Sequence, residues 1–209
     1  MVQQVAESKP VFPSGKANAC HVLVWGWIVG EVVRRTDPKH RPFNIFLNEE
    51  TFTPLSVSHD LFSGVPDAEL SRVTTLYGGN KALLEDTYNT SPASVFPGSN
   101  VHNFKFVQQT VDPGPGAIGK ASAIARVFAL IAEGGELGGV RLLSPERVKD
   151  LTRFRDGAHD QDRILPIPVW FGAAGFWLGG EPGPLIRLLV ITARLFTFLG
   201  LVVLSPGLI

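Results

Sequence analysis

The sequence has one cysteine among its 209 residues. A single cysteine cannot form a disulfide within the chain, so an oxidising compartment is not implied. The first 25 residues also lack the basic and apolar stretches of a secretory signal peptide. These features leave the localisation open between the cytoplasm and a membrane reached through the apolar carboxyl-terminal residues.

The sequence has no excess of charge of either sign. Nineteen basic and nineteen acidic residues balance, and charged residues make up 18% of the chain, against a usual share of about a quarter. Proteins that bind nucleic acids carry a basic surface, so a nucleic-acid partner is not expected. The 22 glycines and 16 prolines predict many loops between short helices and strands.

Two serine-nucleophile motifs are missing. Ser14, Ser63 and Ser99 do not fit the Gly-x-Ser-x-Gly elbow of α/β-hydrolases. No serine is followed three residues later by a lysine, which is the spacing that places a lysine one helical turn from a nucleophilic serine. The sequence therefore offers no acylating serine in either pattern.

Residues 114–122, GPGAIGKAS, match a phosphate-binding loop up to its last position. That position requires Ser or Thr to hold magnesium, and here it is Ala121. Pro113 and Pro115 interrupt the strand that should precede such a loop. We predict a helix entered through a glycine turn, with no nucleotide and no other cofactor.

Cys20 and His21 stand at the start of an apolar run, residues 20–35. Neighbouring residues on a helix point about 100° apart, which is poor geometry for a nucleophile and its base. A zinc site would require further ligands at useful spacing, and the other four histidines are scattered along the chain. We predict that Cys20 is a buried structural cysteine.

The pattern of residues 20–35 predicts a helix that is buried on all sides. Gly26 and Gly30 lie four residues apart on one face, which indicates a close backbone neighbour. Asp37 and Pro38 should end this helix.

Other elements are predicted from periodicity and turn signals. Ser144 should be the N-cap of one helix, and Gly134 with Gly135 should end another. The expectations are an irregular segment over 1–16, an amphipathic helix over 42–54, a turn-rich region over 61–110, a helix over 117–134, a turn and a short extended piece over 137–142, and a strand over 166–180.

The carboxyl-terminal tail, residues 185–209, differs in composition from the rest of the chain. Between Leu188 and Leu204, 12 of 17 residues are Leu, Ile, Val or Phe, and Arg194 is the one charge. On the membrane-insertion scale these contributions nearly cancel, and the length is at the short limit for a bilayer. A membrane helix and a buried apolar tail both stay open for this segment.

Four segments occur in the same order in a known family. They are residues 17–35, 60–76, 117–148 and 171–180, and the most specific is AIGKASAIARVFALIAEGGELGGVRLLSPERV at 117–148. The chain resembles the β-lactamase-related serine hydrolases, which include class C β-lactamases and penicillin-binding-protein-like esterases. The resemblance implies an α/β (α+β), β-lactamase/transpeptidase-like fold that is incomplete here, with a helical lobe and part of an antiparallel sheet.

The resemblance also implies acyl transfer on a small ester or amide substrate. In this family a Ser-x-x-Lys serine attacks the carbonyl, and a tyrosine at the start of a helix assists proton transfer. Relatives have Tyr-His-Ala where this chain has Cys20-His21-Val22, so Cys20 stands at the tyrosine position. The serine–lysine motif lies upstream of that tyrosine in the family, in a region that this sequence does not contain.

We therefore expect a partial β-lactamase-related domain over residues 17–181, preceded by residues 1–16 and followed by the tail at 185–209. It should be catalytically incomplete as written, as a truncated product of its gene would be. The alternatives are a membrane-anchored, non-enzymatic protein with a relic interaction domain, and an esterase completed by a partner chain that carries the missing part.

Overall fold

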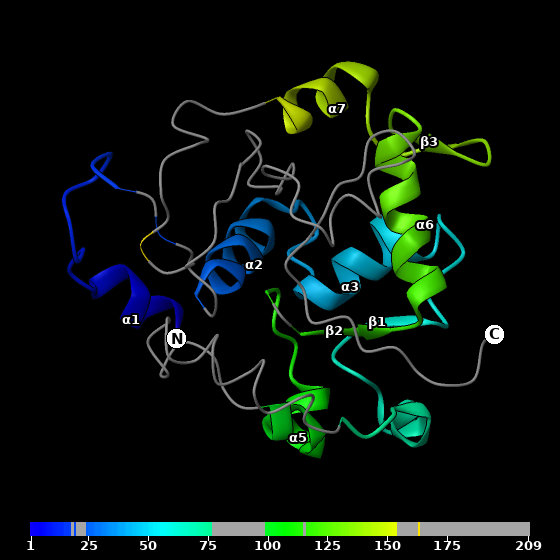
Figure 1. Ribbon diagram of the computed structural model, residues 1–209, viewed down its shortest axis with the longest axis horizontal. Helices are drawn as coiled ribbons and strands as arrows, with labels where there is room; N and C mark the ends of the chain where they lie inside the picture. The colour runs from blue at the N-terminus through cyan, green and yellow to red at the C-terminus, as the bar shows by residue number, and fades with distance from the viewer. Residues whose placement is uncertain (18, 20–23, 77–98, 115, 154–162, 164–209) are drawn as a thin grey trace, which may run out of the picture. The chain divides into compact units, whose positions relative to one another are not determined.

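The computed structural model describes residues 1–17, 19, 24–76, 99–114, 116–153 and 163 (Figure 1). These residues fall into two compact units. The first unit contains residues 1–10 and the described part of 21–124. The second contains the described part of 11–20 and of 125–200. Each unit is described by itself.

Helix α2 (Trp25–Thr36) is the helix predicted from the apolar run. It ends where Asp37 takes an extended backbone ahead of Pro38. Gly26 and Gly30 are its buried residues. A Cβ on Gly26 would lie 2.7 Å from the carbonyl carbon of Pro113 and closer still to the Gly114 backbone. The predicted close neighbour of α2 is therefore the Pro113–Gly114 backbone.

The other face of α2 differs from the prediction. Trp25, Ile28 and Val32 are exposed, so the expectation of a helix buried on all sides is wrong for this face. The apolar pattern does not distinguish this face, which is exposed among the described residues, from the face that packs on Pro113 and Gly114.

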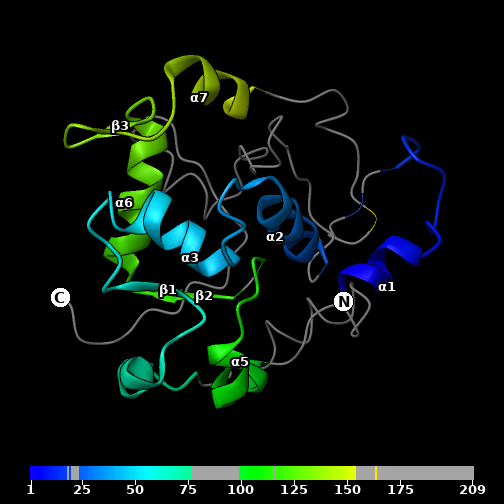
Figure 2. The same cartoon turned by 180° about the vertical axis from the view of Figure 1, so that it is seen from behind.

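Helix α3 (Phe43–Leu47) begins after Pro42 and continues into the π-helical turn η1 (Asn48–Phe52), which confirms the helix predicted over 42–54. Helices α2 and α3 lie side by side in both views (Figures 1 and 2). Apolar side chains that follow α3 form the core of the first unit. Its buried members are Phe52, Leu55, Val57, Leu61, Val65 and Ala123.

A short antiparallel sheet joins two distant parts of the first unit. Strand β1 (Leu61–Ser63) pairs with β2 (Ala117–Gly119), with Phe62 opposite Ile118. The predicted helix over 117–134 is therefore wrong in its first residues, because these residues satisfy their backbone groups in the sheet. Helix α6 (Ala121–Ala132) begins directly after β2.

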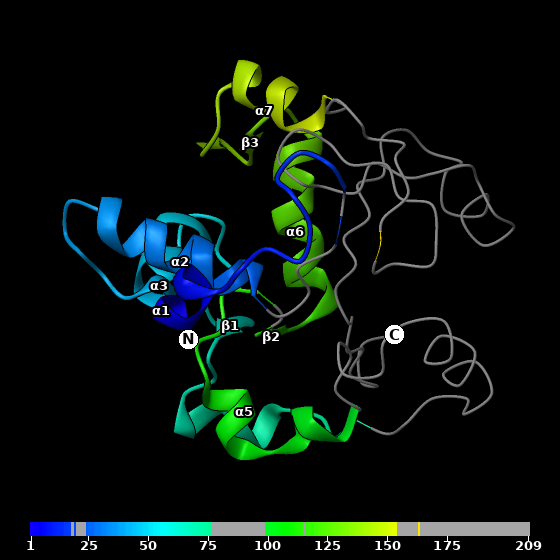
Figure 3. The same cartoon turned by 90° about the vertical axis from the view of Figure 1, so that its left-hand side faces the viewer.

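The remaining elements of the first unit are short, as the turn-rich composition predicted for the described part of 61–110. They are two 3₁₀ helices, η2 (Asp67–Arg72) and η3 (Ser99–Asn103), and helix α5 (Lys105–Gln109). Figure 3 shows α5 packed beside the 3₁₀ helices.

The second unit confirms the predicted helix stop and the next helix start. Gly134 has a φ of 76°, and the amides of Gly134 and Gly135 donate to Ile131 and Leu130. This is the Schellman arrangement that a glycine at the helix end permits.

Strands β3 (Glu136–Leu137) and β4 (Val140–Arg141) form a hairpin, which confirms the predicted turn and extended piece and adds a second strand. Helix α7 (Pro145–Thr152) then begins at the expected cap, where the Ser144 hydroxyl accepts a hydrogen bond from the Arg147 amide.

Three expectations concern the two ends of the chain. Residues Val2–Glu7 form helix α1, so the irregular segment expected over 1–16 is wrong there: local backbone hydrogen bonds suffice for a short helix. The strand predicted over 166–180 and the tail over 185–209 lie outside the described residues. Within the part of the chain that the structure describes, none of the helices is long and apolar enough to cross a bilayer.

The contact between α2 and the Pro113–Gly114 backbone predicts the sign of a stability change. Alanine normally stabilises a helix relative to glycine by about 1 kcal/mol. In Gly26→Ala the new methyl group would overlap the opposite backbone, so we expect a loss of about 2 kcal/mol, as in an overpacked core. Urea unfolding measures the change. Val32→Ala on the exposed face is the matched control and should alter stability little, whereas a gain in stability for Gly26→Ala would contradict the contact.

Candidate functional site

The two residues singled out by the sequence, Cys20 and His21, lie outside the described residues. The buried structural role of Cys20 and its assignment to the family tyrosine position therefore stay predictions. The structure describes the contacts that hold helix α2, which follows these two residues in the chain. It also describes ion pairs and a buried serine hydroxyl elsewhere in the first unit.

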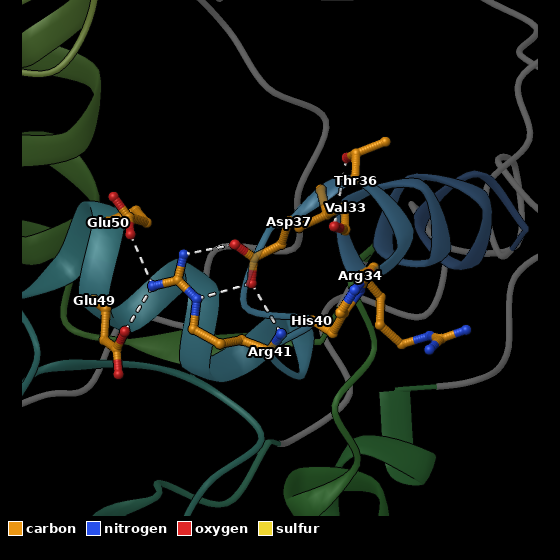
Figure 4. Close-up of polar contacts among 8 residues, drawn as sticks. All are labelled: Val33, Arg34, Thr36, Asp37, His40, Arg41, Glu49 and Glu50. Atoms are coloured by element: carbon orange, nitrogen blue, oxygen red, sulfur yellow. Dashed lines mark hydrogen bonds and ion pairs between the residues drawn. The ribbon is translucent and has the colours of Figure 1, made fainter.

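Arg41 is the centre of a charged cluster at the carboxyl-terminal end of α2 (Figure 4). Its Nε and Nη2 donate to the two carboxylate oxygens of Asp37 at 2.9 and 3.0 Å, and its backbone amide donates to the same carboxylate. Its Nη1 donates to Glu49 at 2.6 Å and to Glu50 at 2.7 Å. The guanidinium also lies over the ring of Phe46, 5.1 Å from its centroid. One side chain thus ties the end of α2 to α3 and η1.

Burial separates this cluster from ordinary surface ion pairs. The side chains of Asp37 and Arg41 are 2% and 11% exposed. The hydrogen bonds from Arg41 hold the pKa of Asp37 well below its usual range, and the carboxylates around Arg41 raise the pKa of the guanidinium. A planar guanidinium bound bidentately to a carboxylate fixes orientation as well as charge. The cluster is therefore a clamp that positions α2.

A second cluster accounts for the lysine of the phosphate-loop-like segment. Lys120 Nζ lies 2.8 Å from Asp60 Oδ1, which also contacts Arg72 at 2.9 Å. The Lys120 amide donates to the Asp60 carbonyl. Contacts with Lys120 and then Arg72 lower the pKa of Asp60. This lysine therefore pairs with a carboxylate beside the β1–β2 sheet.

Ser63 is the one buried side chain among the described residues whose polar atom has no hydrogen-bond partner. It ends β1, opposite Ala117 of β2, and is 6% exposed. A serine hydroxyl becomes a nucleophile when a neighbouring base accepts its proton. Among the described residues no base contacts Ser63, which lies packed at the end of a strand.

The described carboxyl groups whose pKa values are displaced are unsuited to act as general bases near neutral pH. Wherever their pKa values are displaced, the displacement is downward, with cationic partners as the cause for four of them: Glu31, Asp37, Asp60 and Asp67. For Glu31, hydrogen bonds from Arg34 and Arg35 lower the pKa to about 2. General-base catalysis favours a pKa near the working pH, so these groups serve structure. The described part of the chain also holds no cluster of His, Cys, Asp and Glu suited to a metal ion.

Sequence reasoning missed the Arg41 clamp. The sequence predicts a helix stop at Asp37 and gives no signal of its own for a role of Arg41. The spacing Asp37-x-x-x-Arg41 was visible in the sequence, but a four-residue spacing predicts a contact only inside a helix. Here the pair spans the loop between α2 and α3, so the loop conformation was required to find it.

The comparisons identify the family. The sequence model of the Beta-lactamase family matches residues 1–206, and the chain belongs to this family. The match includes residues 1–16 and most of 185–209, which the predicted three-part division places outside the domain. The three-part division of the chain stays a prediction.

A curated relative is esterase/beta-lactamase LipL of Mycobacterium tuberculosis, 28% identical over a 195-residue alignment that covers 86% of this chain and 44% of the relative. Among solved structures, a family VIII carboxylesterase matches with 26% identity and a TM-score of 0.71, covering 85% of this chain and 46% of that one. A penicillin-binding protein homologue from Caulobacter crescentus matches with 28% identity and a TM-score of 0.68, covering 87% and 47%. EstA of Arthrobacter nitroguajacolicus, at 17% identity and a TM-score of 0.65 over 86% and 48%, shows the fold alone.

These structures confirm the β-lactamase/transpeptidase-like fold expected from the sequence. The chain spans less than half the length of each of these relatives. It therefore presents helices and small antiparallel sheets that correspond to part of their domain.

The Arg41 clamp predicts unequal effects for two arginines near the end of α2. Arg41→Ala leaves the buried Asp37 carboxylate without its partner and should destabilise the chain strongly. Arg34→Ala removes a pair with Glu31 in which the arginine is half exposed, and should change stability little. The urea midpoints of the two variants measure the difference. Equal midpoints would contradict the role of the clamp.

The lowered pKa of Asp37 also predicts a pH dependence. Because its folded-state pKa lies below the ordinary value of about 4, ionised Asp37 stabilises the fold above that value. This stabilisation is lost as the pH falls through about 4 toward the folded-state pKa. Urea unfolding between pH 7 and pH 3 should therefore show a smaller loss of stability for Asp37→Asn than for the unsubstituted chain. Parallel curves would show that Asp37 does not contribute.

Proposed function

We propose that this chain is the scaffold part of a β-lactamase-related serine hydrolase that transfers the acyl group of a small ester or amide. The chain as written is catalytically incomplete. Its acylating step requires a Ser-x-x-Lys segment that these 209 residues do not contain.

The absence of any Ser-x-x-Lys spacing in the sequence is the observation that carries this proposal. Without a serine activated by a neighbouring base, the covalent route of the family is closed. The downward-shifted carboxyl groups and the unpartnered hydroxyl of Ser63 support the same conclusion, since none of them offers a substitute nucleophile and base. The esterase and β-lactamase names of the relatives supply the substrate class.

Cys20 and His21 have a secondary place in this proposal. Cys20 occupies the tyrosine position of the resembling family, and a thiol in place of a phenol removes the group that assists proton transfer there. His21 is retained from the Tyr-His pair and could orient water, but it has no nucleophile to assist. Restoring the phenol alone should therefore restore nothing.

The test is covalent labelling with a fluorophosphonate, which reacts with activated serines. The 209-residue chain and its Cys20→Tyr variant should show no mass increase on any serine, and neither should hydrolyse p-nitrophenyl butyrate. The Mycobacterium tuberculosis relative is the positive control for both measurements. A stoichiometric serine adduct on the folded chain that disappears on denaturation would overturn the proposal.

A further inference from the structure

We draw no further inference here: the strongest candidate, the exposed apolar face of helix α2 formed by Trp25, Ile28 and Val32, carries none, because nothing in the described part of the structure shows what covers it.

Discussion

The approach of α2 to the Pro113–Gly114 backbone is the contact on which the arrangement of the first unit depends. At Gly26 there is no room for even one methyl group, so the helix and the loop lie closer than side chains would permit. This contact joins residues almost 90 positions apart in the chain and sets which face of α2 points outward. The Arg41 clamp then fixes the end of the same helix against α3 and η1. Together they fix the glycine face and the carboxyl-terminal end of α2.

Several charged residues of the described region hold this architecture together through ion pairs. Arg41, Lys120 and Arg72 each neutralise carboxylates that lie close to them, and the resulting downward pKa shifts keep those carboxylates ionised near neutral pH. A hydrolase of this family requires a serine beside a base, which is a different arrangement. The described residues thus form a support, and the serine and base of the family's chemistry are not among their observed contacts.

Local signals predicted much of the fold, and long-range contacts account for what they missed. The stop at Gly134–Gly135 and the cap at Ser144 are set by backbone hydrogen bonds within a few residues, so the sequence was sufficient for them. The strand at Ala117–Gly119 depends on pairing with Leu61–Ser63, which periodicity cannot report. The exposure of Trp25 depends on which elements pack against α2. The Arg41 clamp depends on the conformation of the loop between α2 and α3. For the candidate site, the family resemblance supplied the role of Cys20, and no local pattern could have supplied it.

The central proposal is that the chain lacks two groups for acyl transfer: the Ser-x-x-Lys serine with its lysine, and the tyrosine phenol at the position of Cys20. The most direct measurement joins the Ser-x-x-Lys segment of the Mycobacterium tuberculosis relative to the amino terminus of the Cys20→Tyr chain and counts active sites from the burst of p-nitrophenol. The account predicts a burst that approaches one equivalent per folded fusion protein and disappears when the introduced serine is replaced by alanine. A folded fusion protein without a burst, or a burst that survives that replacement, would contradict it.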